Sequence, residues 1–137
     1  EVLLPKTNKV IGIQRTKTPD ELVGLYSEAD VFINPTLEDN FPTTNIEALA
    51  CGTPVVTFRT GGSVEVITSE TGFAVAKGDM EGLLSAIQTV LANGKMHYRA
   101  ACKKKAERDY NKDIQYGKYI KLYQQIMSES NYGKTTF

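Results

Sequence analysis

The residues best suited to chemistry lie together in one stretch of the chain, residues 35–56, with the sequence PTLEDNFPTTNIEALACGTPVV. Its middle part, Thr43–Ala50, has the pattern of a helix. The first backbone N–H groups of a helix have no partner within it, and together with the helix dipole they can hold an anion such as a phosphate. Here those groups belong to Thr43, Thr44 and Asn45.

Acidic side chains stand on both sides of this helix start. Glu38 and Asp39 precede it, and Glu47 lies one turn further into the helix. A carboxylate at Glu47 can accept hydrogen bonds from two hydroxyls of a ribose, as acidic residues do in dinucleotide-binding folds. The stretch therefore indicates a site for phosphate and ribose, placed beyond the end of a strand, where open α/β sheets bind their ligands.

The elements that must position this site alternate between short runs rich in Val and Ile and helical patterns, joined by short turns. We expect strands at Lys9–Gln14, Val31–Asn34, Val55–Phe58 and Gly72–Val75. We expect one helix that begins at Pro19 with Thr18 as its N-cap, and others at Thr43–Ala50, Ser63–Thr68 and Met80–Ala92. This alternation predicts an α/β fold in which helices cover both faces of a parallel sheet.

Several glycines and one acid are expected to shape the ends of these elements. Gly52 is expected to end the helix at residues 43–50 in a left-handed conformation. Gly61 and Gly62 form either a simple turn or a loop that lets the backbone approach a ligand. Asp79 is expected to cap the helix that follows it. The inner face of that helix is expected to carry Leu83, Leu84, Ile87, Val90 and Leu91.

Residues 95–130 have an almost wholly helical pattern, with a break near Tyr110–Asn111. An apolar stripe follows the break, made of Ile114, Tyr119, Ile120, Leu122, Tyr123, Ile126 and Met127. An apolar stripe on a helix has to pack on another surface. Either the sheet or a second domain is expected to supply that surface.

Length and composition limit the class of the protein. Its 137 residues fit one domain, and 41% hydrophobic with 23% charged residues are typical of a soluble globular protein. This composition excludes a disordered tail, a collagen and a membrane span. The two cysteines, Cys51 and Cys102, form no disulfide framework, so we expect a cytoplasmic protein.

The net charge is zero, but its distribution is uneven. Residues 1–94 carry 6 basic and 12 acidic side chains, and residues 95–137 carry 10 basic and 4 acidic ones. The lysines of the second part form either a solvated helix face or a peripheral contact with anionic lipids at the inner membrane face. Nucleic acid is not an expected partner, since no RRM, KH or zinc pattern occurs. The lysines concerned are Lys103, Lys104, Lys105, Lys112, Lys118 and Lys121.

The order of an acidic residue, Phe41, Glu47 and the run ALACGTPVV at residues 48–56 resembles the signature of family 4 (group 1) retaining glycosyltransferases. Flanking features agree, namely Leu25-Tyr26, Ala29-Asp30-Val31, Gly61-Gly62 followed by Glu65, Gly72-Phe73 and Gly78-Asp79. The resemblance runs from about Ile13 to Leu91 and continues more weakly through Tyr119–Tyr123. It implies a Rossmann-like three-layer αβα sheet, which is the C-terminal half of a GT-B fold.

The resemblance also implies a domain organisation and an activity. Residues 1–137 are expected to form one nucleotide-sugar-binding domain, without the N-terminal acceptor domain and the first part of its own fold, and residues 95–130 its C-terminal helical segment. The expected enzyme transfers a sugar from a nucleoside-diphosphate sugar to a saccharide or lipid-linked acceptor. The isolated chain is expected to be inactive.

Two acids with the spacing E-x7-E flank the loop in the resembled family: the first contacts donor-sugar hydroxyls and the second holds the ribose. Glu47 matches the second acid. Asp39 stands at the first position in place of Glu, and Glu38 fills that role if the register shifts by one residue. The amides between the acids meet sugar and phosphate in the family, which implies this role for Asn40, Phe41, Thr43, Thr44 and Asn45.

Three further expectations concern the donor. The family's Gly-Phe-Gly is Asn40-Phe41-Pro42 here, so one amide donor is lost at Pro42. Gln14 and Arg15 are expected to line the base pocket. No Asp-x-Asp occurs in the chain, so the usual carboxylate pair for a diphosphate-bound Mg²⁺ or Mn²⁺ is absent, and we expect transfer without a metal or another cofactor.

Two other hypotheses come from different functional classes. A non-catalytic α/β nucleotide-binding or receiver-like regulatory domain would receive a phosphate on an acid at a strand end. The strand at residues 31–34 ends in Asn34 and the stretch KVIGIQRT holds no acid, so the sequence disfavours this hypothesis. The other is a binding-only relic of the glycosyltransferase fold, in which Asp39 and Pro42 mark lost catalysis.

Overall fold

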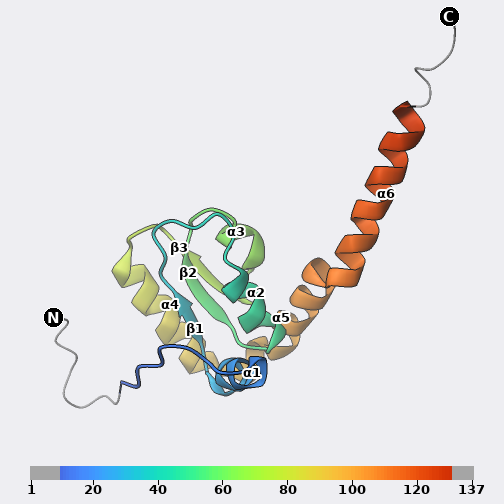
Figure 1. Ribbon diagram of the computed structural model, residues 1–137. Coiled ribbons are helices and arrows are strands. Elements are labelled where there is room, and N and C mark those ends of the chain that lie inside the picture. The colour runs from blue at the N-terminus through green and yellow to red at the C-terminus, as the bar shows by residue number, and fades with distance from the viewer. Residues whose placement is uncertain (1–9, 131–137) are drawn as a thin grey trace, which may run out of the picture.

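The computed structural model describes residues 10–130 of the chain. Three short parallel strands form the sheet in the order β1 (Phe32–Asn34), β2 (Val55–Phe58) and β3 (Gly72–Val75) (Figure 1). Ile33 of β1 lies beside Val56 of β2, which lies beside Phe73 of β3. All four residues of β2 are buried, because this central strand is covered on both faces.

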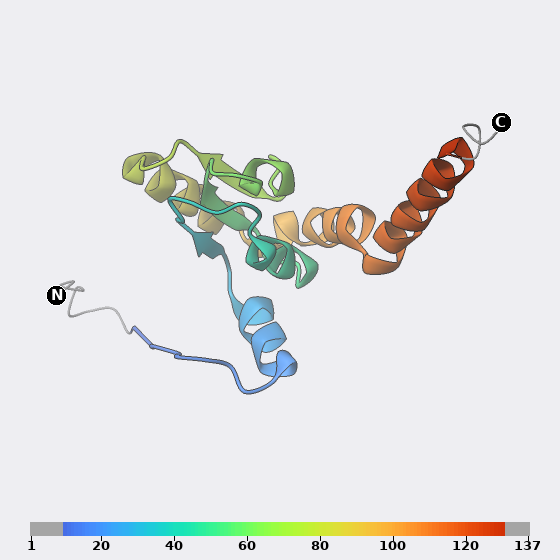
Figure 2. The same ribbon diagram turned by 45° about the horizontal axis from the view of Figure 1, so that its top comes forward.

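Residues 10–130 also contain six helices: α1 (Pro19–Glu28), α2 (Thr43–Ala50), α3 (Ser63–Val66), α4 (Met80–Asn93), α5 (Lys95–Tyr110) and α6 (Lys112–Ser130). Both β-to-β connections move in the same direction across the sheet, so right-handed crossovers place α2 and α3 on one face. Helix α4 packs on β2 and β3 on the other face (Figure 2). The predicted parallel α/β architecture with both faces covered is confirmed.

Local signals in the sequence set where the helices begin. The Thr18 side chain accepts a hydrogen bond from the Glu21 backbone N–H at 3.2 Å, and Pro19 occupies the first turn of α1. The Asp79 carboxylate accepts from the Gly82 backbone N–H at 2.8 Å. Both predicted N-caps are confirmed, and such a cap contributes about 1 kcal/mol. Gly52 follows α2 with a φ of 80°, the left-handed conformation expected of it.

One expected strand is wrong. Of Lys9–Gln14, residue 9 lies outside the described residues, and residues 10–14 form no strand. The side chains of Val10, Ile11 and Ile13 are more than half exposed. A strand needs a neighbour for its hydrogen bonds, and residues 10–14 pair with none of the three strands described.

Two smaller expectations also need correction. The helix expected at residues 63–68 ends at Val66. On α4, the buried residues are Leu83, Ala86 and Val90, whereas Leu84 is 56% exposed and Leu91 52% exposed. The short strands present a narrow surface, so one row of side chains at i, i+3 and i+7 touches it and the adjacent row stays outside.

The core lies around β2 and joins the sheet to α2, α4 and α5. Ala48 and Leu49 of α2 and Tyr98 and Cys102 of α5 are at most 2% exposed. Helices α2 and α5 pack against each other, and Ile46 and Ala106 extend their contact. Helix α2, which carries much of the predicted site, is therefore held by the sheet on one side and by α5 on the other.

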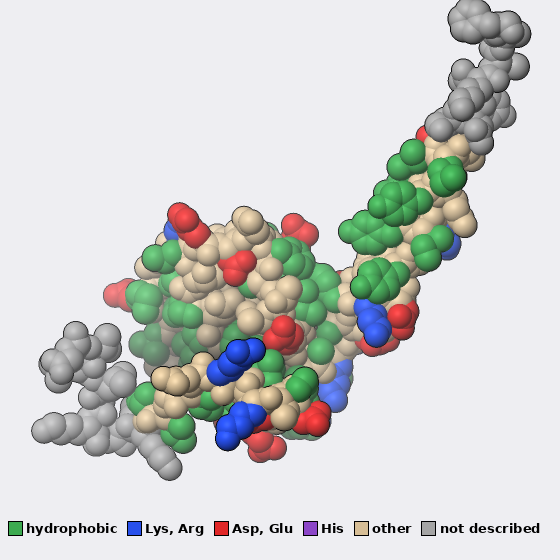
Figure 3. Space-filling view, viewed as in Figure 1, with side chains coloured by type: hydrophobic (Ala, Val, Ile, Leu, Met, Phe, Trp, Pro, Cys, Tyr) green, Lys and Arg blue, Asp and Glu red, His purple; other side chains and the backbone are tan. Residues whose placement is uncertain are grey.

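Helix α6 leaves this body after a break at Asn111 and projects away from it (Figure 1). The predicted break and helix are confirmed. Apolar side chains are exposed along the length of α6 (Figure 3), and those of the predicted stripe are 46–69% exposed. The sheet does not cover this stripe. Among the described residues, no helix is long and apolar enough to cross a membrane.

Candidate functional site

The carboxyl ends of all three strands open onto one shallow cavity of about 370 Å³. Residues 37–40 reach it after β1, Arg59, Thr60 and Gly61 after β2, and Lys77 after β3. This is the edge at which parallel α/β sheets bind ligands. The structure thus brings Glu38, Asp39 and Asn40 together as the sequence predicts, and adds Arg59 and Lys77. Their only signal in the sequence is their place just after a strand.

Hydrogen bonds between loops fix the acidic segment at this cavity. The Phe41 backbone N–H donates to Asp39 Oδ1 at 3.0 Å, which closes a tight turn within the loop. The Gly62 backbone N–H donates to the Asn40 carbonyl at 2.8 Å. The Thr60 hydroxyl donates to the Thr36 carbonyl at 3.3 Å. The loop after β1 is therefore positioned by the loop after β2.

The paired glycines are what allow this approach. Gly61 has a φ of +45°, and a Cβ there would lie 1.8 Å from the Asp39 carbonyl oxygen. A Cβ on Gly62 would lie 2.1 Å from the Phe41 ring. Only glycine fits at either position without displacing the acidic loop. The close approach that the glycines permit is thus to the protein's own acidic loop.

The two candidates for the first acid differ in their surroundings. The Glu38 side chain is 92% exposed, and its charged neighbour Lys77 lies at 4.0 Å between Nζ and Oε1. An ion pair as open as this contributes little to stability. Asp39 holds its carboxylate against the Phe41 backbone. Asp39 is therefore held in place by the loop, whereas Glu38 extends into solvent.

The start of α2 departs in part from expectation. Its N-cap is Pro42, which makes no side-chain capping bond. The Asn45 backbone N–H donates to the Pro42 carbonyl at 3.1 Å, so the prediction that this amide is unpaired is wrong. This hydrogen bond joins residues three positions apart, as in a 3₁₀ turn, which is common at helix ends. Within residues 10–130, the amides of Thr43 and Thr44 have no backbone acceptor.

The Asn45 side chain has a structural role. It is fully buried, and its Oδ1 accepts a hydrogen bond from Asn34 Nδ2 at 2.9 Å. This bond ties the end of β1 to the first turn of α2. It holds the N-terminus of α2 in register with the strand end.

Glu47 lies on the exposed side of α2 and has a partner, Tyr26, that no local pattern in the sequence indicates. The Tyr26 hydroxyl of α1 donates to Glu47 Oε2 at 3.2 Å. Burial, and next the Glu47 charge, raise the pKa of Tyr26 to about 12.

Glu47 also lines a second open cavity, which has a volume of about 410 Å³. The other residues that line it are Phe41, Thr43, Ile46, Asp109, Tyr110, Gln115 and Tyr119. Asn40 and Phe41, adjacent in the chain, join the two cavities.

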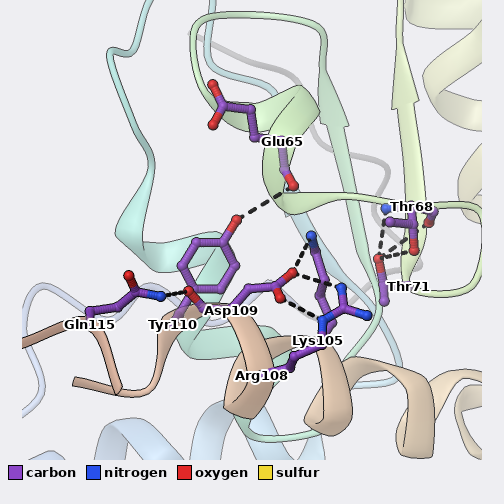
Figure 4. Close-up of polar contacts among 8 residues, drawn as sticks. All are labelled: Glu65, Thr68, Thr71, Lys105, Arg108, Asp109, Tyr110 and Gln115. Atoms are coloured by element: carbon purple, nitrogen blue, oxygen red, sulfur yellow. Dashed lines mark hydrogen bonds and ion pairs between the residues drawn. The ribbon is translucent and has the colours of Figure 1, made fainter. Parts of the chain in front are cut away.

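The far wall of the second cavity is the junction between α5 and α6 (Figure 4). Asp109 pairs with Lys105 at 2.7 Å and with Arg108 at 2.5 Å, and these cations hold the pKa of the Asp109 carboxyl well below its usual range. The Gln115 side chain donates to the Asp109 carbonyl at 2.5 Å. The Tyr110 hydroxyl donates to the Glu65 carbonyl of α3 at 3.4 Å. The Gln115 bond thus joins the base of α6 to the end of α5, and the Tyr110 bond joins that end to α3.

Gln14 and Arg15 do not join this arrangement. Both are exposed, and neither lines either cavity. The stretch before α1 extends away from the sheet (Figures 1 and 2). Their role in a base pocket stays a prediction from the resemblance.

Comparison with known proteins places this chain in a family. The chain matches the family model "Glycosyl transferases group 1" over residues 4–109. It is 35% identical over 86 residues to a GDP-mannose-dependent alpha-(1-6)-phosphatidylinositol dimannoside mannosyltransferase of Mycobacterium tuberculosis, covering 63% of this chain and 22% of the relative. It is 26% identical over 132 residues to the capsular polysaccharide biosynthesis glycosyltransferase CapM of Staphylococcus aureus, covering 94% and 34%.

A solved structure agrees with these sequence matches. Sucrose-phosphate synthase from Thermosynechococcus elongatus superposes with a TM-score of 0.70 and 32% sequence identity, covering 80% of this chain and 28% of that one. The chain thus spans between about a fifth and a third of the length of these three proteins. The family match includes α1 to α4, all of α5 but its last residue, the loops that follow the three strands, and Glu47. The chain belongs to the group 1 glycosyltransferase family, and it has the α/β fold of a GT-B glycosyltransferase domain.

Proposed function

We propose that this chain is the donor-binding domain of a retaining glycosyltransferase, which moves a sugar from a nucleoside-diphosphate sugar to a saccharide or lipid-linked acceptor. The observation that carries the proposal is the convergence of three strand-end loops on Glu38, Asp39 and Asn40, next to the N-terminus of α2 and to Glu47. The name of one relative includes GDP-mannose, which makes a GDP-sugar one candidate donor.

The proposed chemistry is electrostatic. The leaving nucleoside diphosphate gains negative charge as the glycosidic bond breaks, and the N-terminus of α2 offers the amides of Thr43 and Thr44 to that charge. One such preorganised donor stabilises a transition state by about 2.7–4 kcal/mol. We assign the donor-sugar hydroxyls to Asp39, with Glu38 as its neighbour, and the ribose hydroxyls to Glu47.

Metal-independent transfer is part of the proposal and rests on the sequence, which contains no Asp-x-Asp. The acceptor would be bound by polypeptide outside this chain, in keeping with the greater length of the relatives. The peripheral membrane contact stays a prediction that rests on the lysines of α5 and α6. Membership of the family does not favour the receiver-like alternative.

Calorimetric titration of the complete protein with UDP, GDP and ADP tests the proposal. One of these nucleotides is expected to bind, and Glu47→Gln is expected to weaken its binding about tenfold or more, because hydrogen bonds to a charged group are lost. Glu81→Gln, an exposed change in the first turn of α4, is the matched control. Equal binding by the Glu47 and Glu81 variants would contradict the donor site. Sugar transfer by the unaltered protein separates an enzyme from a binding-only relic.

A further inference from the structure

A buried side chain from another helix donates a hydrogen bond to the Glu47 carboxylate. Its partner, Tyr26, lies on α1, 21 positions earlier, and is only 8% exposed. The hydroxyl donates to Oε2 at 3.2 Å. A carboxylate has about four acceptor positions, so this bond leaves positions free for a ligand's hydroxyls.

Several contacts hold Tyr26 in place. Its ring packs edge-on against Phe32 of β1, with centroids 5.2 Å apart. Its backbone carbonyl accepts from the Thr53 hydroxyl at 2.5 Å and from Lys95 Nζ at 3.5 Å. Lys95 also donates to the Ser27 carbonyl at 2.5 Å. The hydroxyl is therefore presented to Glu47 by a side chain that β1, α5 and the residues before β2 hold in position.

We propose that Tyr26 is a positioning residue that orients the Glu47 carboxylate toward the ribose of the donor nucleotide. This rests on the proposed function, since it requires Glu47 to bind ribose. A carboxylate held in one orientation before the ligand arrives loses less conformational freedom on binding. Like any tyrosine hydroxyl, this group is protonated at neutral pH and so can donate. Burial, and next the Glu47 charge, raise its pKa further, to about 12.

The test compares ribonucleotides with their 2′-deoxy counterparts. The probe is whichever of UDP, GDP and ADP binds the complete unaltered protein, together with its 2′-deoxy form. Tyr26→Phe keeps the ring contact with Phe32 and removes only the hydroxyl. It is expected to weaken ribonucleotide binding about 3- to 10-fold and 2′-deoxynucleotide binding by less. A role in stability alone would not change the ratio of the two dissociation constants.

Two further variants sharpen the test. Tyr98→Phe is the matched control, because Tyr98 is also a buried tyrosine but its hydroxyl accepts from Asn93 Nδ2 at 2.8 Å and makes no hydrogen bond to Glu47. It is expected to leave both affinities unchanged. The double variant Tyr26→Phe with Glu47→Gln is expected to bind no more weakly than Glu47→Gln alone, because Tyr26 acts through Glu47.

The outcomes separate the two proposals. If Glu47→Gln weakens binding and Tyr26→Phe leaves the ribose to 2′-deoxyribose ratio as in the unaltered protein, the role of Tyr26 is overturned and the donor site stands. If Glu47→Gln has no effect, both proposals fail. The ratio is measured on one sample for each variant, so partial loss of folded protein does not obscure it.

Discussion

Helices α2 and α6 both carry apolar residues, but those of α2 pack into the core whereas those of α6 are exposed. The eight residues of α2 include Ala48 and Leu49, which are fully buried between the sheet and α5. The nineteen residues of α6 leave Leu122, Tyr123 and Ile126 at least half exposed. The helix that carries Glu47 is thus fixed along its whole length, whereas α6 is fixed at its base. A binding site needs its charged groups at fixed positions, and a helix packed into the core, such as α2, can provide them.

The largest expected difference between the two helices is in their contribution to stability. Leu49→Ala leaves a cavity in the core and is expected to cost about 2–5 kcal/mol of unfolding free energy. Leu122→Ala, the matched change on α6, is expected to cost less than about 0.5 kcal/mol, since that side chain is half exposed. Urea unfolding measures both. Similar losses would mean that the α6 stripe is covered in solution.

The next effect concerns the loop in front of α2. Gly61→Ala places a methyl group against the Asp39 carbonyl and is expected to cost about 2–3 kcal/mol and to weaken nucleotide binding. Gly78→Ala is the control, because Gly78 has a φ of +79° but open space around it, and should cost about 1 kcal/mol. Thermal unfolding and titration are the measurements. Equal binding by the two variants would show that the close contact does not position the acidic loop.

A smaller, pH-dependent effect is expected at the base of α6. The pKa of Asp109 is lowered chiefly by Arg108 and then by Lys105, so its ion pairs add stability above the ordinary Asp value of about 4. That stability is lost as the pH falls through the lowered pKa of the folded state. Asp109→Asn should therefore reduce the fall in melting temperature between about pH 5 and pH 2. An unchanged pH profile would show that the pairs are open in solution.

The smallest effect is expected from the lysines of α6. Replacing Lys118 and Lys121 together by Gln should change the unfolding free energy by less than about 0.5 kcal/mol, because neither residue makes an ion pair among the described residues. Co-sedimentation with vesicles containing phosphatidylglycerol then separates the two interpretations of these charges. If the unaltered protein binds the vesicles and the Lys118 and Lys121 double variant does not, the membrane contact is supported. If the unaltered protein does not bind them, these lysines form a solvated helix face.

Much of this fold could be predicted because its signals are local. Thr18, Asp79 and Gly52 specify helix ends through bonds and backbone angles within a few residues, and the structure confirms each. The buried strand β2 and the partly buried strand β3 follow directly from runs of apolar residues. The positions of the acids Glu38, Asp39 and Glu47 follow from their spacing within the single motif at residues 35–56. Their functional roles stay predictions.

The predictions that proved wrong share a different cause. They concern features that depend on packing and pairing with other parts of the structure and not on residue type alone. Residues 10–14 have strand-like residues, but a strand forms only beside another strand. Leu84 fits the apolar period of α4, yet the width of the sheet decides how much of that face is buried. The amide of Asn45 is paired because the first turn of α2 tightened, which the residue types alone do not specify.

The sequence by itself determined most of the alternation of strands and helices, the helix ends at Thr18, Asp79 and Gly52, and the position of Glu38, Asp39 and Glu47 in one motif. These features depend on residues close together in the chain. Only the tertiary structure decided that Tyr26 contacts Glu47 and that Arg59 and Lys77 share a cavity with the acidic loop. Parallel strands bring their carboxyl ends to one edge whatever their separation in sequence. Which side chains meet there is set by how the connecting loops and helices pack.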